Sequence, residues 1–224
     1  MNPEKKNAGH RAAEYVEDGM VVGLGTGSTA KYAIEKIGDR IEEEELDIVG
    51  IPTSIETERR AKKAGIELVE LDQADKIDLT IDGADEVDLQ KNLIKGGGGA
   101  LLREKMIAFN SKKYIVIVDP SKMVDKLGLD FDLPIEVLSH WYKGTADCLR
   151  RLDCEPKLRK INGETYQTDN GNYIFDCDFS EGIKGPDVLS KKLNSIPGVL
   201  ENGLFLDFAD LVIMGKKKGF EEKS

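Results

Sequence analysis

Residues 20–37 read MVVGLGTGSTAKYAIEKI, and this stretch decides the fold. The compact apolar run over residues 20–24 predicts a buried strand that ends in a glycine-rich turn. A helical pattern follows over residues 28–37, with Ser28 or Thr29 near the N-cap position. Strand, glycine turn and helix in direct succession are the units from which α/β sheets are built.

The same alternation of short apolar runs and helical patterns continues as far as residue 118. Gly65 stands where a helix C-cap belongs. We expect a mostly parallel sheet with helices on both faces. Its further strands are expected at residues 47–51, 67–71, 77–81 and 114–118, and its further helices at residues 55–64 and 100–110.

The pattern changes after Gly128 and predicts a small α+β module of the ferredoxin-like type. Its strands are expected at residues 134–138, 157–161 and 172–178, and its helices at residues 144–152 and 186–195. The apolar runs 204–208 and 210–215 are expected to return to the first sheet, and the charged tail 216–224 is expected to be a frayed end.

Composition excludes several classes of protein. The chain has 224 residues and a formal net charge of −10, which argues against a nucleic-acid binder. Apolar runs are all shorter than the ~18–20 residues of a membrane helix, and the charged N-terminus has no signal-peptide core. Three cysteines, Cys148, Cys154 and Cys177, give no disulfide framework, so we expect small buried thiols in a cytoplasmic protein.

The glycine turn at residues 23–29, GLGTGST, is the first candidate functional segment. Glycines let a backbone approach a ligand closely, and the N-terminus of the following helix favours an anion. The segment lacks the Gly-Lys-[Ser/Thr] of a Walker loop, and Ser28 stands where a dinucleotide fingerprint has its third glycine. The alternative is an ordinary glycine-rich turn with a helix cap.

A second candidate, DGADEVD at residues 82–88, follows the predicted strand 77–81. Ligands of open α/β sheets bind at the carboxyl ends of strands, so Asp82 and Asp85 could share one site. Paired carboxylates suit acid–base chemistry or recognition of sugar hydroxyls. A solvated acidic loop and a metal site are the alternatives, and the lack of a further acidic cluster disfavours the metal.

The third candidate is KGGGGALLREK at residues 95–105. Lys95 could stabilise a developing oxyanion, and Glu104 in the following helix could act as a general base. The alternatives are an exposed helix carboxylate for Glu104 and a flexible linker for the glycines. Together the three segments supply the parts for proton transfer on a phosphorylated polyol.

In these three motifs the chain resembles the A-type ribose-5-phosphate isomerase family. Further matching stretches are VDPSK (118–122), FDLPIEV (131–137), TDNGN (168–172) and IPGVLENGLF (196–205), so the resemblance covers almost the whole chain in order. It implies interconversion of D-ribose 5-phosphate and D-ribulose 5-phosphate in the non-oxidative branch of the pentose phosphate pathway. It also implies no cofactor and no metal, a sugar phosphate as the only small-molecule partner, and a homodimer or homotetramer.

The resemblance also implies a fold and a set of site residues. The fold is a Rossmann-like catalytic domain, residues 1–129 and 205–224, with an inserted small α+β domain, residues 130–204. The catalytic residues are Glu104 as base with Asp82, Asp85 and Lys95, and either aspartate could assist ring opening. The substrate-binding residues are Thr26, Gly27, Ser28, Thr29, Asp82, Gly83, Ala84, Asp85, Lys95, Gly96, Gly97, Gly98 and Lys122. Lys5 or Lys6 aligns with a family lysine near the phosphate.

Two other classes of function are weighed against this one. A sugar-phosphate sensor of a transcription regulator would normally carry an N-terminal helix-turn-helix, and only about twenty residues precede the first predicted strand. The other alternative is a related aldose–ketose isomerase, amino-sugar deaminase or CoA-transferase-like enzyme. Turnover of ribose 5-phosphate in EDTA separates these possibilities.

Overall fold

The computed structural model describes residues 2–224, which form two compact units. The first unit comprises residues 2–84, 103–123 and 207–224, and the second comprises residues 85–102 and 124–206. Residues 85–102 therefore group with the second unit, whereas the sequence placed them in the first domain. The expected division into a domain of residues 1–129 and 205–224 and a domain of residues 130–204 stays a prediction, because compact units are not the same as domains.

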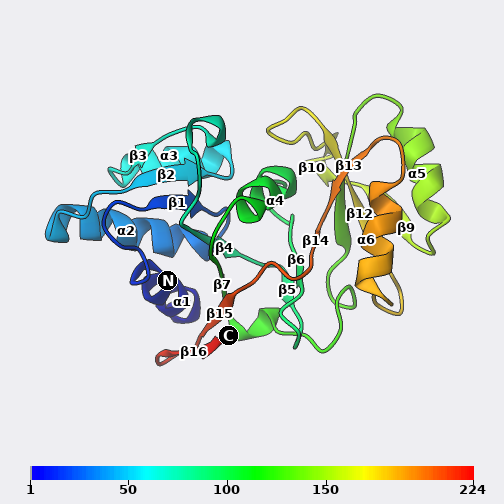
Figure 1. The fold of residues 1–224 in the computed structure, drawn as a ribbon. Coiled ribbons are helices and arrows are strands. Elements are labelled where there is room, and N and C mark those ends of the chain that lie inside the picture. Colours follow the sequence, from blue (N-terminus) through cyan, green and yellow to red (C-terminus); the bar gives the residue numbers. More distant parts are fainter. Residues whose placement is uncertain (1) are drawn as a thin grey trace. The chain divides into compact units, whose positions relative to one another are not determined.

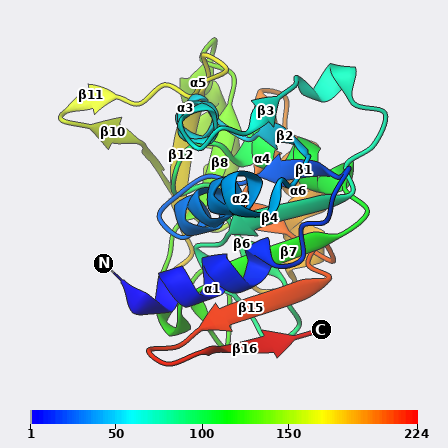
Figure 2. The ribbon, with the colours of Figure 1, turned by 90° about the vertical axis from the view of Figure 1, so that its left-hand side faces the viewer.

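The first unit is built on a seven-stranded sheet (Figure 1). Six strands are parallel and lie in the order β3-β2-β1-β4-β7-β15. Counted along the chain within this sheet, that is the order 3-2-1-4-5-6 of a Rossmann fold. The strands are β1 (Val21–Leu24), β2 (Val49–Pro52), β3 (Glu67–Leu68), β4 (Leu79–Gly83), β7 (Tyr114–Val118) and β15 (Leu211–Gly215), with the antiparallel β16 (Phe220–Lys223) at the edge. Figure 2 shows β16 beside β15.

Helices cover both faces of this sheet, as predicted. They are α1 (Pro3–Ala13), α2 (Ala30–Glu44), α3 (Ile55–Lys63) and α4 (Leu101–Phe109). Successive strand residues point to opposite faces. Val22 and Leu24 of β1 join the core beneath α1 and α2, whereas Val21 packs with Ile107 of α4 on the other face.

The second unit contains the predicted ferredoxin-like module. Its antiparallel sheet has the order β13-β8-β12-β9, which is the 4-1-3-2 order of a split βαβ fold. The elements are β8 (Leu133–Val137), α5 (Tyr142–Arg150), β9 (Glu155–Leu158), β12 (Tyr173–Asp178), α6 (Pro186–Asn194) and β13 (Val199–Asn202). A hairpin of β10 (Lys160–Ile161) and β11 (Glu164–Thr165) follows β9.

A small sheet in the second unit was not predicted. It has the order β14-β6-β5, with β5 (Glu86–Val87), β6 (Leu93–Ile94) and β14 (Leu204–Phe205). The prediction that residues 204–208 return to the first sheet is therefore wrong. Only the run 210–215 returns, as β15, because Leu204 and Phe205 pair with β6 instead.

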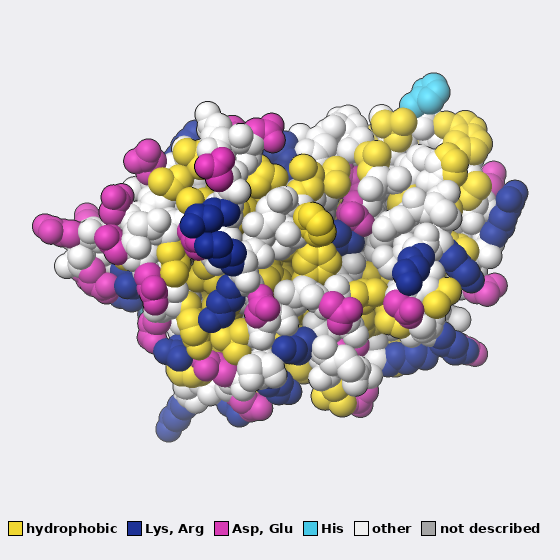
Figure 3. Space-filling view, in the orientation of Figure 1, with side chains coloured by type: hydrophobic (Ala, Val, Ile, Leu, Met, Phe, Trp, Pro, Cys, Tyr) yellow, Lys and Arg dark blue, Asp and Glu magenta, His cyan; other side chains and the backbone are white. Residues whose placement is uncertain are grey.

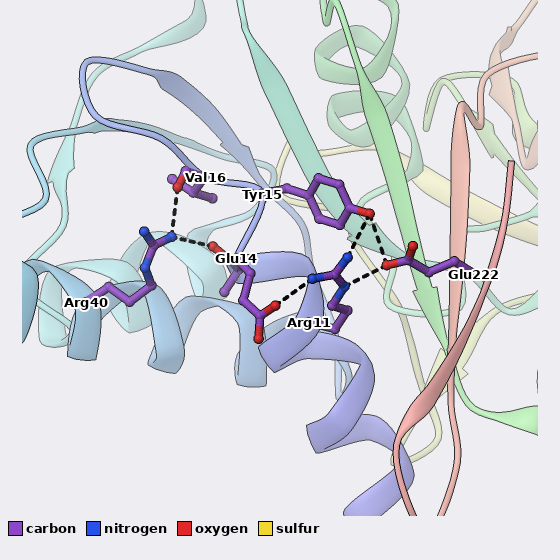
Figure 4. A network of polar contacts seen from close by, with 7 residues as sticks. Arg11, Glu14, Tyr15, Val16, Arg40 and Glu222 are labelled. Carbon is purple, nitrogen blue, oxygen red and sulfur yellow. Dashed lines mark hydrogen bonds and ion pairs between the residues drawn. The ribbon is translucent and has the colours of Figure 1, made fainter.

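The prediction of a frayed tail is also wrong. Residues 220–223 form β16, which pairs antiparallel with β15 after a turn closed by a hydrogen bond from the Lys216 N–H to the Gly219 carbonyl. Glu222 of β16 accepts a hydrogen bond from Arg11 Nε at 2.7 Å and one from the Tyr15 hydroxyl at 3.0 Å (Figure 4). The tail is therefore tied to the N-terminal helix α1, an element the sequence analysis missed.

Helix α2 runs seven residues beyond its predicted end at residue 37. Its last turn and its C-cap carry the acidic run Glu42–Glu45, and acidic side chains gather at this end of the helix in Figure 3. Two short 3-10 helices complete the elements, η1 (Leu71–Gln73) and η2 (Pro120–Lys122). Within residues 2–224, no helix is both long and apolar enough to cross a membrane. All three cysteines are free thiols, and Cys154 and Cys177 are buried.

Candidate active site

The first unit places two of the predicted segments side by side. Strands β1 and β4 are parallel neighbours, and the strand order reverses between them. Ligands of open α/β sheets bind outside the carboxyl ends of the strands at such a switch point. The glycine turn after β1 and Asp82 at the end of β4 both lie there.

The glycine turn and Asp82 are in direct contact. Asp82 is fully buried, and its Oδ1 accepts hydrogen bonds from the Thr26 N–H at 3.1 Å and the Gly83 N–H at 2.7 Å. A Cβ on Gly25 would lie 2.2 Å from that oxygen, so only glycine lets the backbone approach this closely. The turn is therefore shaped around the carboxylate.

Hydroxyl groups that follow β2 hold the glycine turn through Thr26. Its hydroxyl hydrogen-bonds with the Thr53 hydroxyl at 2.7 Å and donates to Ser54 Oγ at 2.8 Å. The Thr57 hydroxyl in turn donates to the Gly25 carbonyl at 3.0 Å. This hydroxyl cluster, Thr26, Thr53, Ser54 and Thr57, was not predicted, because hydroxyl residues after β2 carry no distinctive motif.

The start of α2 offers an anion site. Gly27 has φ +112° and open space where a Cβ would stand, and Ser28 is exposed. Thr29 is the N-cap of α2, and its own hydroxyl makes no capping hydrogen bond. Helix N-termini attract anions through their N–H groups and dipole.

Lys5 adds positive charge at this helix start. Lys5 Nζ donates to Ser28 Oγ at 2.7 Å and lies 3.7 Å from Asp119 Oδ2. Asp119 caps η2, which ends at the half-buried Lys122. Of the two lysines the sequence left open, Lys5 is the one whose ammonium group reaches the glycine turn.

The charges of Asp82 and Glu104 act on a buried tyrosine, Tyr114. The Tyr114 hydroxyl donates to Asp82 Oδ2 at 3.5 Å, and Glu104 is only 5% exposed. Burial, followed by the charges of Asp82 and Glu104, raises the pKa of Tyr114 well above its ordinary value. The tyrosine thus stays neutral and donates its hydrogen bond to Asp82. No sequence pattern singles out Tyr114, because it is the first residue of an apolar strand.

The remaining predicted residues lie in the second unit, except Gly83 and Ala84, which end the first segment of the first unit. Asp85 Oδ2 accepts a hydrogen bond from the Gly97 N–H at 2.7 Å. Lys95 is 2% exposed, its N–H donates to the Gly203 carbonyl, and its ammonium group lies 5.5 Å from the centre of the Phe205 ring. Gly97 and Gly98 are exposed.

Within residues 2–224, no group of three or more His, Cys, Asp or Glu side chains is arranged to hold a metal ion. The predicted site residues of each unit supply carboxylates and backbone N–H groups, to which the first unit adds hydroxyls and lysines and the second unit adds the buried Lys95. These groups suit proton transfer and binding of an anionic, hydroxylated ligand.

Comparison with known proteins decides between the remaining possibilities. The family model of ribose 5-phosphate isomerase A (phosphoriboisomerase A) matches residues 49–219. The chain belongs to this family. It is 50% identical to ribose-5-phosphate isomerase A 1 of Oceanobacillus iheyensis over 95% of this chain and 94% of that one. The Listeria innocua relative is also 50% identical, over 98% and 97% of the two chains.

Solved structures agree. The isomerase resembles ribose 5-phosphate isomerase A of Methanocaldococcus jannaschii with a TM-score of 0.94 and 42% identity, over 98% of this chain and 97% of that one. It also resembles a D-ribose-5-phosphate isomerase in complex with phospho-erythronic acid, with a TM-score of 0.95 and 42% identity over all of both chains. The predicted enzyme class is confirmed: the protein is an isomerase that interconverts D-ribose 5-phosphate and D-ribulose 5-phosphate.

Proposed function

We propose that the Glu104 carboxylate of this isomerase carries the proton between C2 and C1 of the sugar. One observation supports this proposal above the others. Glu104 is nearly fully buried, and its charge, together with that of Asp82, acts on the Tyr114 hydroxyl. Titratable groups gathered in a buried cluster at a switch point are typical of acid–base sites.

The proposed reaction begins with opening of the sugar ring, for which Asp82 or Asp85 exchanges the proton. Glu104 then removes the proton from C2 of the aldose, which leaves an enediolate, and returns it to C1 to give the ketose. Lys95 and the N–H groups of the glycine loop stabilise the oxyanion that develops between the two steps.

We propose that the substrate phosphate binds at the start of α2, with the backbone N–H groups of residues 27–29, the Ser28 and Thr29 hydroxyls, Lys5 and Lys122 as its ligands. The contact between Lys5 and Ser28 supports this assignment. Phosphate binding is remote from the reacting carbons and orients them. Replacing Ser28 and Thr29 together by alanine should raise KM more than it lowers kcat, and an unchanged KM would remove the hydroxyls from the phosphate site.

The main test is Glu104→Gln, assayed on ribose 5-phosphate in EDTA. A positioned general base contributes about 10²–10⁴ in rate, so we expect kcat to fall at least about 100-fold with the fold intact. Phospho-erythronic acid, which a solved relative binds, serves as a probe of the intact site by calorimetry. Glu35→Gln, on an exposed position of α2, is the charge-matched control. A Glu104→Gln variant with the wild-type rate would show that another group is the base.

We also propose that the isomerase is a homodimer or homotetramer and works in the cytoplasm. Phe109 and Met106 on α4 are 79% and 49% exposed, which is apolar surface that a second copy could cover. Light scattering behind size exclusion tests the assembly, and a molar mass of one chain at micromolar concentration would reject it. The three free thiols suit a reducing compartment.

A further inference from the structure

The glycine loop of the second unit, residues 96–99, is held by side chains that no motif singled out. We propose that Arg159, fixed by Asp176, is a positioning residue that holds this loop so that the Gly98 N–H faces the substrate oxyanion. The inference rests on the proposed role of the loop in the isomerase reaction. Arg159 itself is not proposed to touch the substrate.

Arg159 connects the loop to the ferredoxin-like sheet. Its Nη1 donates to the Gly96 carbonyl at 2.8 Å and to the Gly97 carbonyl at 3.2 Å. Its Nε donates to Asp176 Oδ2 at 2.9 Å and its Nη2 to Asp176 Oδ1, so the ion pair is bidentate. The Arg159 side chain is only 12% exposed, which makes the pair stiffer and less screened than a surface pair.

The pair sits on rigid elements. Asp176 lies in the middle of β12, and Arg159 directly follows β9, the neighbouring strand. The Arg159 N–H donates to the Ile174 carbonyl of β12 at 2.8 Å, so the backbone is fixed at this point too. A guanidinium group fixed to a sheet holds the glycine loop in a more precise position than a side chain on another loop would.

Peptide geometry turns these carbonyl contacts into an orientation of N–H groups. In a planar trans peptide, the carbonyl of one residue and the N–H of the next point in opposite directions. Holding the Gly96 carbonyl on Arg159 therefore turns the Gly97 N–H away from the guanidinium group, where it meets Asp85 Oδ2 at 2.7 Å. Holding the Gly97 carbonyl turns the Gly98 N–H away in the same manner.

Tyr166 holds the other end of the loop. Its hydroxyl donates to the Gly98 carbonyl at 3.5 Å, and the Arg159 guanidinium lies 5.9 Å from the centre of its ring. The ring occupies the space where a Cβ of Gly99 would stand, 2.1 Å from the tyrosine oxygen. Gly96 and Gly99 have φ of +106° and +81°, and the Gly99 N–H donates to the Gly96 carbonyl at 3.0 Å.

The glycines therefore make the turn, and Arg159 with Tyr166 keeps it in one conformation. A run of four glycines would otherwise sample many backbone states. Donors that are oriented before the reaction stabilise a developing oxyanion without reorganising, and losing one such donor typically costs about 10²–10³ in kcat. A loss of orientation should therefore reduce kcat and leave phosphate-driven binding almost unchanged.

The test compares Arg159→Ala, Arg159→Lys and Asp176→Asn with the wild type in steady-state assays on ribose 5-phosphate. We expect Arg159→Ala to lower kcat about 10- to 100-fold while KM changes less than about threefold. Arg159→Lys should have a kcat between those of the wild type and Arg159→Ala, because an ammonium group cannot hold both carbonyls as the planar guanidinium group does. Arg150→Ala, an exposed arginine of α5 paired with Asp147, is the matched control.

Chemical rescue separates positioning from simple structural support. Guanidinium at low, non-denaturing concentration should restore part of the kcat of Arg159→Ala and should leave Arg150→Ala unchanged. Tyr166→Phe, which removes only the hydroxyl, should lower kcat about two- to tenfold and keeps the proposal testable if Arg159→Ala does not fold.

Three results would overturn the proposal. They are an unchanged kcat in folded Arg159 variants, a rise of KM alone, and a loss of kcat that follows a lower Tm without guanidinium rescue. A wild-type protein that does not turn over ribose 5-phosphate would instead remove the proposed function on which the inference rests.

Discussion

At the scale of single residues, the acidic side chains of residues 82–88 make different contacts and have different roles. Asp82 shapes the glycine turn and faces Tyr114, whereas Asp85 accepts the Gly97 N–H. Glu86 and Asp88 instead serve the local fold. Asp88 Oδ1 accepts N–H groups from Gln90 and Asn92, both at 2.8 Å.

Glu86 makes the pH dependence of stability testable. It is 2% exposed and accepts the Gly128 N–H at 2.7 Å, and burial is the main cause that raises its pKa above the ordinary 4.5. The folded state therefore binds the Glu86 proton more tightly than the unfolded state does. The stability contributed by this proton is fully present below pH 4.5 and is lost as pH rises through the raised pKa.

We therefore predict that the free energy of unfolding of the wild type, measured relative to Glu86→Gln, falls as pH rises above 4.5. Urea unfolding at several pH values measures this difference. A difference that grows with pH would mean that the hydrogen bonds to the carboxylate outweigh its burial, and would reverse the assigned direction of the pKa.

A second prediction at this scale concerns the close approach of Gly25 to Asp82. A Cβ there would lie 2.5 Å from the Asp82 Cα, which cannot move without shifting β4. Gly25→Ala should lower the free energy of unfolding by about 1–3 kcal/mol. Gly83→Ala is the control, because its Cβ would have no neighbour nearer than 3.8 Å and should cost less than about 1 kcal/mol. Equal losses from the two variants would contradict the close packing of the turn.

At the scale of elements, strands and helices with a clear hydrophobic pattern were predicted well, and those without one were not. Strand β7 was predicted with its true bounds because five consecutive buried residues interrupt polar flanks. Strand β16 reads FEEK and has no apolar alternation, so only the free edge of β15 makes it a strand. The site segments were predicted from glycines and charges, but Arg159 and Tyr114 act through tertiary contacts that no local pattern contains.

The edge strand β16 gives the prediction at this scale. Deleting residues 217–224 leaves the backbone of β15 unpaired on one side and removes the ion pair between Arg11 and Glu222. Exposed strand edges favour association, so we expect a lower Tm and new oligomers in size exclusion. Glu222→Ala removes only the partly exposed pair and should cost no more than about 1 kcal/mol. A deletion variant as stable as Glu222→Ala would show that β16 contributes little.

At the scale of the whole molecule, the chain passes between its two units four times, and three of these passages fall near a predicted site residue. The first falls between Ala84 and Asp85, the second between Leu102 and Arg103, and the third directly after Met123, the residue that follows Lys122. Some of the predicted site residues therefore belong to the first unit and others to the second, which the sequence motifs alone did not reveal. A net charge of −10 is compatible with a phosphate ligand because N–H groups and a few lysines provide local positive potential.

Each unit has its own hydrophobic core, and this predicts that the two units unfold locally and independently. Leu149 is fully buried in the core of the second unit, and Ile34 is 2% exposed in that of the first. Replacing either by alanine should cost about 2–5 kcal/mol, because a cavity remains. We expect Leu149→Ala to speed amide exchange in β8, β12 and β9 while β1, β4 and β7 keep their protection, and Ile34→Ala to do the reverse. Hydrogen exchange followed by mass spectrometry measures both. Equal loss of protection in all six strands in either variant would show that the two cores open as one cooperative unit.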